Sequence, residues 1–180
     1  MTEIYPPSED SFFLTNLLKK EIPELLKKNS ELTFLEIGAG SGIHLETAFK
    51  SGIKKENIYS CDINPAAVSH CNLLGFHCIH SNLFEQIKES FDLIIFNPPY
   101  LPGHKFDLEP DTYAGKKEDV IVRFLQQAKS HLNKDGRIFL LLSSKTPMEH
   151  IEEEMGRYQT KLLGNERLFY EELFIYELTQ

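Results

Sequence analysis

The sequence predicts an α/β fold in which a seven-stranded, mostly parallel sheet carries helices on both faces. From Thr33 onward, short apolar runs alternate with longer amphipathic stretches, which is typical of successive strand–helix–strand units. Runs such as Phe91–Phe96 are almost continuously apolar, as expected for strands that are buried on both faces. A glycine-rich turn, Gly38–Gly42, joins the first run to a helical stretch, as in doubly wound sheets.

The individual elements follow from the period of the apolar residues. Strands are predicted at Thr33–Ile37, Asn57–Asp62, Phe76–His80, Phe91–Phe96, Arg137–Ser143, Thr160–Leu163 and Glu172–Leu178. Helices are predicted at Ser11–Lys20, Ile43–Lys50, Pro65–Leu74, Glu118–Leu132 and Pro147–Tyr158. Asn64 and Thr146 each precede a proline at the expected first turn of a helix, so we expect them to be helix caps.

Length and composition favour a single domain of a soluble protein. The 180 residues are 41% apolar, which suffices for a core without disulfides or metals. The net charge of −8 weighs against unaided nucleic-acid binding, because phosphate contacts normally require a basic face. We find neither a cationic leader followed by an apolar stretch nor an apolar run of bilayer length, and we expect a cytoplasmic protein that contacts no membrane.

The cysteines are three in number and form no C-x-x-C pair: Cys61, Cys71 and Cys78. We therefore expect buried free thiols. Three histidines lie nearby and leave a metal site as an alternative: His70, His77 and His80. Their spacing matches no zinc motif, so no metal is predicted.

The first motif is the glycine turn, which follows Glu36 and has the pattern G-x-G-x-G. Glycines let the backbone turn sharply and let a ligand approach the main chain, and the helix amino terminus that follows favours an anionic group. Asp62 ends the next strand, ~20 residues after the glycine turn. A carboxylate at this position can accept hydrogen bonds from ribose hydroxyls. Together they predict a nucleoside-containing cofactor, with a nicotinamide enzyme or a plain structural turn as alternatives.

The second motif is Asn97-Pro98-Pro99-Tyr100, directly after the strand Phe91–Phe96. Prolines are stiff and lack an N–H, so this loop presents mainly acceptors, namely the Asn97 side-chain oxygen and main-chain carbonyls. An NH₂ group bound there would be held with its lone pair in line with a methyl donor, while Tyr100 stacks on the flat substrate. The two motifs together predict a methyltransferase that acts on a planar amide or amino nitrogen.

With these motifs, the chain resembles the class I S-adenosylmethionine methyltransferases, which have a Rossmann-like fold. More narrowly, it resembles the short archaeal and eukaryotic type of HemK-like release-factor glutamine N5-methyltransferase. The segment Tyr5–Phe12 looks like the family's opening segment, and Ala114–Gly115 with Glu118–Phe124 looks like the segment after the catalytic loop. The resemblance covers nearly the whole chain, with residues 1–30 as a helical segment over the cofactor and residues 31–180 as the core.

The resemblance implies S-adenosyl-L-methionine as cofactor and assigns residues to it and to the target amide. The residues implied for the cofactor are Asp10, Ser11, Glu36, Gly38, Gly40, Asp62, Ile63, Asn82, Leu83 and Asn97. Those implied for catalysis are Asn97, Pro98, Pro99 and Tyr100. Asn82 stands where the family usually has aspartate, so its contact to adenine would lack charge assistance and the cofactor would bind more weakly.

The implied substrate is the glutamine of the Gly-Gly-Gln motif of a class I release factor. Relatives of this length often work with a small zinc-binding activator, and the third strand, apolar through Phe76, Cys78 and Ile79, is a candidate edge for it. An edge covered by the chain's own helices is the equal alternative. Asn-Pro-Pro-Tyr also occurs in enzymes that methylate adenine N6 or guanine N2 of nucleic acids, and a catalytically silent subunit is a third interpretation.

Overall fold

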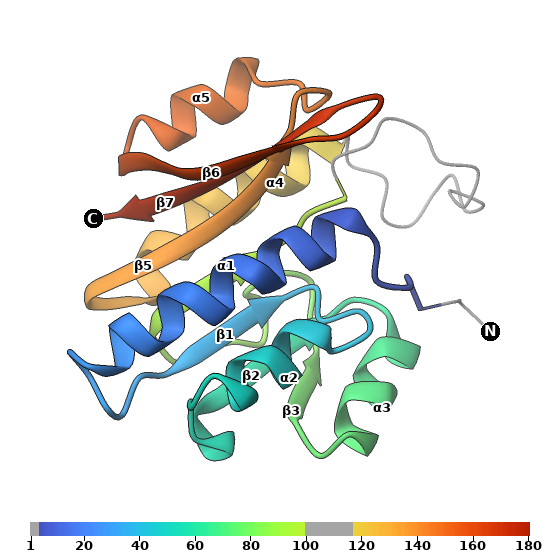
Figure 1. The fold of residues 1–180 in the computed structure, drawn as a ribbon, viewed down its shortest axis with the longest axis vertical. Coiled ribbons are helices and arrows are strands. Elements are labelled where there is room, and N and C mark those ends of the chain that lie inside the picture. The colour runs from blue at the N-terminus through green and yellow to red at the C-terminus, as the bar shows by residue number, and fades with distance from the viewer. Residues whose placement is uncertain (1–3, 100–116) are drawn as a thin grey trace.

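The computed structural model describes residues 4–99 and 117–180, and it confirms the predicted seven-stranded α/β fold (Figure 1). The helices are α1 (Glu9–Leu26), α2 (Ile43–Lys50), α3 (Pro65–Leu73), α4 (Lys117–Ala128) and α5 (Glu149–Met155), with short 3₁₀ turns η1 (Lys55–Asn57) and η2 (Lys129–His131). The strands are β1 (Phe34–Ile37), β2 (Ile58–Asp62), β3 (His77–His80), β4 (Phe91–Phe96), β5 (Leu132–Ser143), β6 (Gln159–Arg167) and β7 (Glu172–Thr179).

The sheet has the order β3-β2-β1-β4-β5-β7-β6, with β1 to β5 parallel and β7 antiparallel to β5. The chain first adds strands on one side of β1 and then, with β4, on the other side. Such a reversal opens a crevice at the carboxyl ends of the two central strands, which is where open α/β sheets bind ligands. The order therefore fixes where a site is to be sought, between the ends of β1, β2 and β4.

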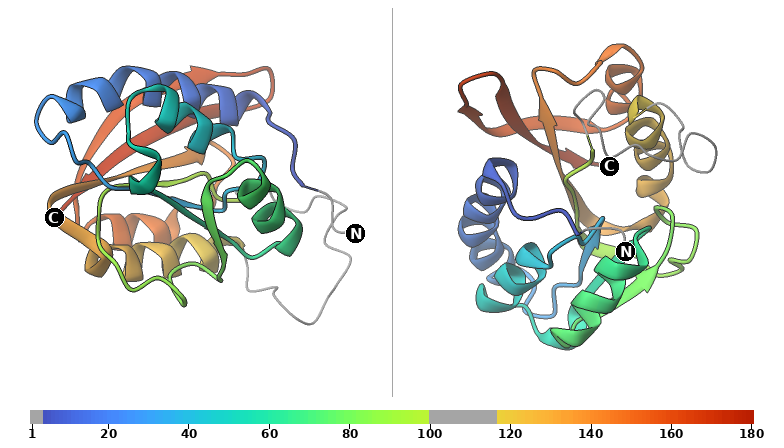
Figure 2. Two further views of the ribbon diagram at one scale, coloured as in Figure 1. Left: turned by 90° about the horizontal axis from the view of Figure 1, so that it is seen from below. Right: turned by 90° about the vertical axis from the view of Figure 1, so that its right-hand side faces the viewer.

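Each face of the sheet is covered by its own helices, because side chains alternate along the buried strands. Leu93 and Ile95 of β4 pack beneath α1, α2 and α3, whereas Ile94 and Phe96 pack beneath α4 and α5. Figure 2 shows these two helical layers on opposite sides of the sheet. None of the helices in residues 4–99 and 117–180 has the length and apolar character needed to span a bilayer.

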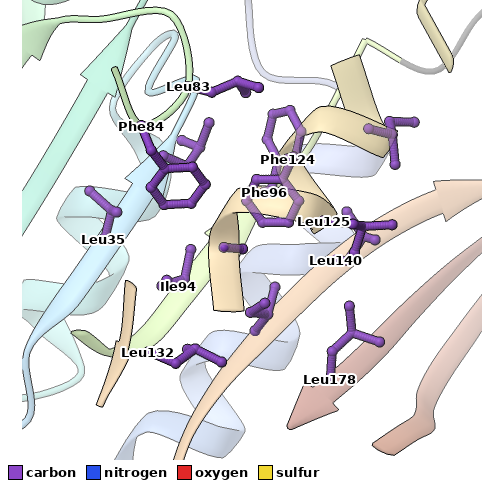
Figure 3. Packing of buried hydrophobic residues seen from close by; sticks show 14 of the residues in the cluster. Leu35, Leu83, Phe84, Ile94, Phe96, Phe124, Leu125, Leu132, Leu140 and Leu178 are labelled. Atoms are coloured by element: carbon purple, nitrogen blue, oxygen red, sulfur yellow. The ribbon is translucent and has the colours of Figure 1, made fainter. Parts of the chain in front are cut away.

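Phe96 ends β4 within a group of aromatic rings, and this packing fixes the loop that follows. Its ring centroid lies 4.6 Å from that of Phe124, which in turn stacks at 5.6 Å on Phe84 (Figure 3). All three rings are at most 4% exposed. Because closely packed interiors resist displacement, the backbone at Asn97 starts from a rigid position.

Several predicted boundaries are wrong, and the first helix shows why. α1 extends from Glu9 to Leu26 and includes Pro23, whereas the prediction ended at Lys20. A proline inside a helix removes one backbone hydrogen bond, but Ile22 and Leu25 continue the buried stripe on either side of it. Burial of that stripe outweighs the lost bond. Strand β6 is likewise longer than predicted, because it pairs with β7 along its length.

Strand β5 begins at Leu132, where the sequence predicts the end of a helix. Asp135 has a φ of 64°, and a Cβ on Gly136 would come within 2.8 Å of the Asn133 oxygen, so the strand starts with a tight irregularity. This feature hides the strand pattern before Arg137.

The Asn64 cap is confirmed, since its side chain accepts from the Ala66 N–H at 3.0 Å. The Thr146 cap is wrong, because its hydroxyl accepts from the Ser143 N–H at 3.0 Å and α5 begins only at Glu149. The prediction of buried free thiols is confirmed for Cys61, Cys71 and Cys78.

Candidate functional site

The carboxyl ends of the first four strands bring the described site candidates to one edge of the sheet. Glycines 38 and 40 follow β1, Asp62 ends β2, Leu83 follows β3 and Asn97 follows β4. The first turn of α1 adds Asp10 and Ser11 to the same place, through contacts to Asn97 and His44. Tyr100 and Ala114–Gly115, also singled out in the sequence, lie outside the described residues.

The glycine turn has a conformation that favours glycine at each of its three positions. Gly38, Gly40 and Gly42 have φ values of 74°, 49° and 75°, in the left-handed region. A Cβ on Gly40 would meet no atom of the described chain within 4 Å, so the turn borders open space there. The turn thus offers a bare main chain to a ligand.

Asp62 fastens this turn to the end of β2. Its Oδ2 accepts from the Gly40 N–H and its Oδ1 from the Asn64 N–H, both at 2.8 Å. A carboxylate has about four acceptor positions, so each oxygen keeps capacity for a further donor. Asp62 is 9% exposed, and the neighbouring Ile63 is 41% exposed. A charged acceptor and an apolar surface therefore stand side by side at the end of β2.

Asn97 is oriented by Asp10. The Asn97 Nδ2 donates to Asp10 Oδ2 at 3.1 Å. A carboxylate only accepts hydrogen bonds, so the amide nitrogen must face Asp10 and the oxygen must point the other way. Asn97 Oδ1 is buried and finds no hydrogen-bond partner among the described residues. Leaving a buried acceptor unmet costs ~1–3 kcal/mol, which a ligand that donates to this oxygen would recover.

Glu36 and His44 form a buried pair beneath the glycine turn. His44 Nδ1 lies 2.7 Å from Glu36 Oε1, and His44 Nε2 lies 3.1 Å from the Ser11 carbonyl oxygen. Glu36 is 2% and His44 4% exposed. The ring thereby links β1, α2 and α1 at the site. Glu36 Oε2 is buried and, within the part of the chain that the structure describes, has no hydrogen-bond partner.

One proton is shared between the two side chains of this pair. The Ser11 carbonyl can only accept, so His44 Nε2 carries a hydrogen, and a second proton must lie between Nδ1 and Glu36 Oε1. Burial raises the pKa of Glu36, against the effect of the His44 ring. Burial acts to lower the pKa of His44, but Glu36, the Ser11 carbonyl and Asp10 outweigh it and raise that pKa. Both pKa values are shifted upward, so the folded chain holds this proton more tightly than the separate side chains would.

Replacing Glu36 with glutamine should flatten the pH dependence of stability. In the wild type the folded chain keeps the shared proton above about pH 6.5, where an unfolded histidine loses its own. The free energy of unfolding should fall by up to about 1.4 kcal/mol per pH unit as pH rises toward the raised pKa of His44. In Glu36→Gln an amide N–H can donate to a neutral His44 throughout this pH range. The free energy of unfolding of the variant should therefore depend less on pH.

Urea unfolding of the cofactor-free wild type and Glu36→Gln between pH 6 and pH 9 measures this difference. Parallel pH profiles for the two proteins would show that no proton is held between Glu36 and His44.

The end of β3 supplies a strained backbone turn. Leu83 has a φ of 52°, rare for a leucine, and its carbonyl accepts from Ser81 Oγ at 2.9 Å and Cys61 Sγ at 3.3 Å. The Asn82 amide group donates to Glu85 Oε1 at 2.9 Å, which turns the Asn82 oxygen away from Glu85. Strain that surrounding contacts hold in place is typical of binding sites.

His44 belongs to the site but was not predicted from the sequence. Its signal was present: His44 shares the buried side of its helix with Leu45 and Ala48, where a titratable residue needs a partner. Residues 4–99 and 117–180 contain no cluster of three or more side chains suited to hold a metal ion.

The unmet groups at this edge suit a ligand with many hydrogen-bond donors and a positive charge. Glu36 Oε2 and Asn97 Oδ1 are unpartnered acceptors within the described chain, and Asp62 has capacity left. S-adenosylmethionine has an ammonium group, two ribose hydroxyls and a sulfonium, so its chemistry fits this set of acceptors. Its carboxylate fits the amino terminus of α2 beside the open glycine turn.

Comparison with known proteins agrees with this chemistry. The family model "Methyltransferase small domain" matches residues 13–168. A Methanocaldococcus jannaschii protein named as an N5-glutamine methyltransferase is 36% identical over 157 residues, covering 80% of this chain and 74% of that protein. Ribosomal RNA small subunit methyltransferase C of Escherichia coli is 28% identical over 126 residues, covering 67% of this chain and 34% of that protein.

Among solved structures, the Encephalitozoon cuniculi Mtq2–Trm112 complex, described as responsible for methylation of the termination factor eRF1, aligns over 100% of this chain and 99% of its own. The TM-score is 0.74 and the identity 25%. The chain therefore belongs to the methyltransferase small domain family, and it is a class I methyltransferase of the HemK-like, Mtq2 type that uses S-adenosylmethionine as methyl donor.

Proposed function

We propose that this enzyme methylates the side-chain amide of a glutamine in a class I translation termination factor, at the Gly-Gly-Gln motif. The observation that carries the proposal is Asn97 Oδ1, a buried acceptor without a partner in the described chain. An acceptor fixed at this point selects a substrate nitrogen that carries hydrogens. A glutamine amide, NH₂ on a planar group, meets that requirement.

The cofactor would be held by residues of α1, β1 and β2 and of the turns that follow β1, β2 and β3. Glu36 Oε2 would accept from its ammonium group, Asp62 from its ribose hydroxyls, and Ile63 and Leu83 would enclose its adenine with Asn82 at the amino group. Gly38 and Gly40 would leave room for it, while Asp10 and Ser11 in the first turn of α1 would cover its methionine end. Residues 1–30 act in this scheme as a helical cover on the core formed by residues 31–180.

Asn97 performs the central step by orientation. When bound, the cofactor supplies an electrophilic methyl group on a sulfonium. Asn97 Oδ1 and the neighbouring main-chain carbonyls accept both hydrogens of the substrate NH₂ and turn its lone pair toward that methyl group. The acceptors are in place before the reaction, so they would stabilise the positive charge that develops on nitrogen, and the nitrogen would release one of its two hydrogens as a proton as or after the new bond forms. Pro98 and Pro99 keep this part of the loop stiff, and Tyr100 would stack on the amide, as the family resemblance implies.

Transfer of isotopically labelled methyl groups tests this function. The substrates are a class I release factor with its Gly-Gly-Gln glutamine intact or replaced, and total RNA and DNA, each with and without the activator subunit. We expect label in the intact release factor alone. Label that survives replacement of the glutamine would contradict the proposal.

A nucleic-acid base amine is the second candidate, favoured by the similarity to ribosomal RNA small subunit methyltransferase C. Exocyclic amines also carry two hydrogens on a planar group, so Asn97 does not separate the two substrates. The net charge of −8 favours the protein substrate, since base-directed enzymes must also bind the phosphate backbone. Label only in RNA or DNA would establish this candidate. Cofactor binding without transfer to any substrate would indicate a catalytically silent subunit.

We further propose that a small activator subunit docks on β3, an edge strand of the sheet. The outward-facing backbone N–H and C=O of Cys78 are capped by the Asn72 side-chain amide, at 3.2 and 2.9 Å, so a partner would meet this edge mainly through side chains and would add a strand at Cys78 only by displacing Asn72. Phe76 and Cys78 are buried, and His77 and His80 are exposed. The apolar residues thus face the core, and a partner would meet the strand's edge and its histidines.

Substitution of His77 should weaken this complex. Cys78→Lys would disrupt the core, because Cys78 is only 5% exposed, so the exposed His77 is the better position. We expect gel filtration after co-expression to give a heterodimer for the wild type and a separated catalytic subunit for His77→Asp. Lys161→Asp on β6, the opposite edge of the sheet, is the control and should remain in the heterodimer. Identical elution of all three proteins would remove β3 as the docking edge.

A further inference from the structure

The turn between β6 and β7 carries two aromatic side chains that the fold does not use. Phe169 and Tyr170 are 90% and 80% exposed, and their rings form an edge-to-face pair at 4.7 Å. They occupy the centre of a turn closed by the Leu168 N–H and the Glu171 carbonyl at 2.8 Å. Gly, Asn, Asp and Pro usually fill such positions. Exposed aromatic rings in place of turn-forming residues indicate contact with another molecule.

This turn lies at the same edge of the sheet as Asn97. β7 runs antiparallel to β5, and its Leu173 pairs with Ser143 at the carboxyl end of β5. Ser143 Oγ also donates to Glu171 in the turn. Figure 1 shows the β6–β7 turn on the side toward which β1 and β5 point and where α1 begins. The aromatic pair therefore stands at the rim of the site.

Tyr5 interacts electrostatically with an acidic residue of the site and with one of the turn. Partial burial and then the Asp10 carboxylate raise the pKa of Tyr5, and Glu171 contributes in the same direction, so the ring lies within electrostatic reach of both carboxylates. Asp10 in turn bonds to Asn97. Tyr5 is 61% exposed. An aromatic and acidic rim thus runs from Asn97 through Tyr5 to Phe169 and Tyr170.

We propose that Phe169 and Tyr170 dock the polypeptide that flanks the target residue of a protein substrate. This inference rests on the proposed function and adds a recognition surface to it. Aromatic rings bury a large area for little loss of conformational freedom, which makes them common anchors of protein interfaces. The carboxylates of Glu9, Asp10 and Glu171 on this rim repel phosphates, so the rim favours a polypeptide over RNA.

Kinetics with the double variant Phe169→Ala/Tyr170→Ala test the surface. We expect the KM for the intact release factor to rise about tenfold, a loss of about 1.4 kcal/mol, with kcat and the Kd for S-adenosylmethionine unchanged. Leu162→Ala removes another exposed apolar side chain, 48% exposed, from β6 of the same hairpin and should leave KM unchanged. Thermal unfolding should be the same for all variants, since the aromatic pair packs on no core.

The outcomes separate this inference from the proposed function. A wild-type enzyme that leaves the release factor unlabelled overturns both. Labelling by the wild type with the same KM in the double variant overturns the docking surface alone. So does an equal rise in KM for Leu162→Ala, because the effect would then belong to the hairpin as a whole. A double variant that loses only RNA labelling would also overturn the docking surface. It would indicate that the two rings stack on nucleotide bases.

Discussion

Asn97→Ala should lower the rate of methyl transfer by about 10²–10³-fold, the range found when one preorganised hydrogen-bonding group is removed from an active site. The alanine lacks the Oδ1 acceptor, so nothing fixed in the loop's side chains orients the substrate nitrogen. The Kd for S-adenosylmethionine should change only a few-fold, because Glu36 and Asp62 remain. Initial rates with saturating cofactor, and calorimetric titration of the cofactor, measure the two quantities separately.

Asn133→Ala is the matched control for this variant. Asn133 is also partly buried, and its amide also donates to a carboxylate, Asp92 Oδ1 at 2.9 Å, but it lies at the start of β5, the opposite end from the site. The Asn133→Ala variant should be less stable than the wild type and should keep the wild-type turnover number. Undiminished transfer by Asn97→Ala would show that the chemistry does not depend on this amide.

Asp62→Ala should weaken the binding of S-adenosylmethionine by about 100-fold or more. Two hydrogen bonds to a charged acceptor, each contributing ~1.5–3 kcal/mol, are lost from the ribose, and the Gly40 N–H loses the acceptor that holds the glycine turn. Asp62→Asn should fall between wild type and alanine, because an amide oxygen can replace only one of the two acceptors. Calorimetry with the cofactor alone measures this without reference to a substrate.

Asp92→Ala provides the control for Asp62. The Asp92 carboxylate also accepts a backbone N–H, that of Thr33 at 2.8 Å, but at the amino end of the sheet. Its removal should destabilise the fold and leave the cofactor Kd unchanged. Equal weakening in both variants would mean that Asp62 acts through stability and not through contact with the cofactor.

The parts that the sequence predicted well depend on local pattern. Buried parallel strands such as β1 and β4 are short apolar runs, and their carboxyl ends meet at one edge, so Gly38, Asp62 and Asn97 could be placed together without coordinates. The Asn64 cap is likewise a local feature, since donor and acceptor are two residues apart. Tertiary packing has little influence on where these strands and this cap form.

The parts that it could not predict depend on contacts between distant segments. Asp10 and Asn97 are 87 residues apart, and only the packing of α1 on the sheet brings them within 3.1 Å. The same packing aligns Ser11 with His44. Pattern also failed where tertiary structure overrode it, as at Pro23 within α1 and at the irregular start of β5. The orientation of Asn97, which decides its chemistry, follows from one such long-range contact.

The most direct test of the central claim is to locate the transferred methyl group. Tandem mass spectrometry of the release factor after reaction with the wild-type enzyme would assign the methyl group to an atom of a particular residue. We expect a methylated side-chain nitrogen on the Gly-Gly-Gln glutamine. A methyl group on a carboxylate oxygen, on a lysine, or only on a nucleotide base in a parallel RNA digest would contradict it.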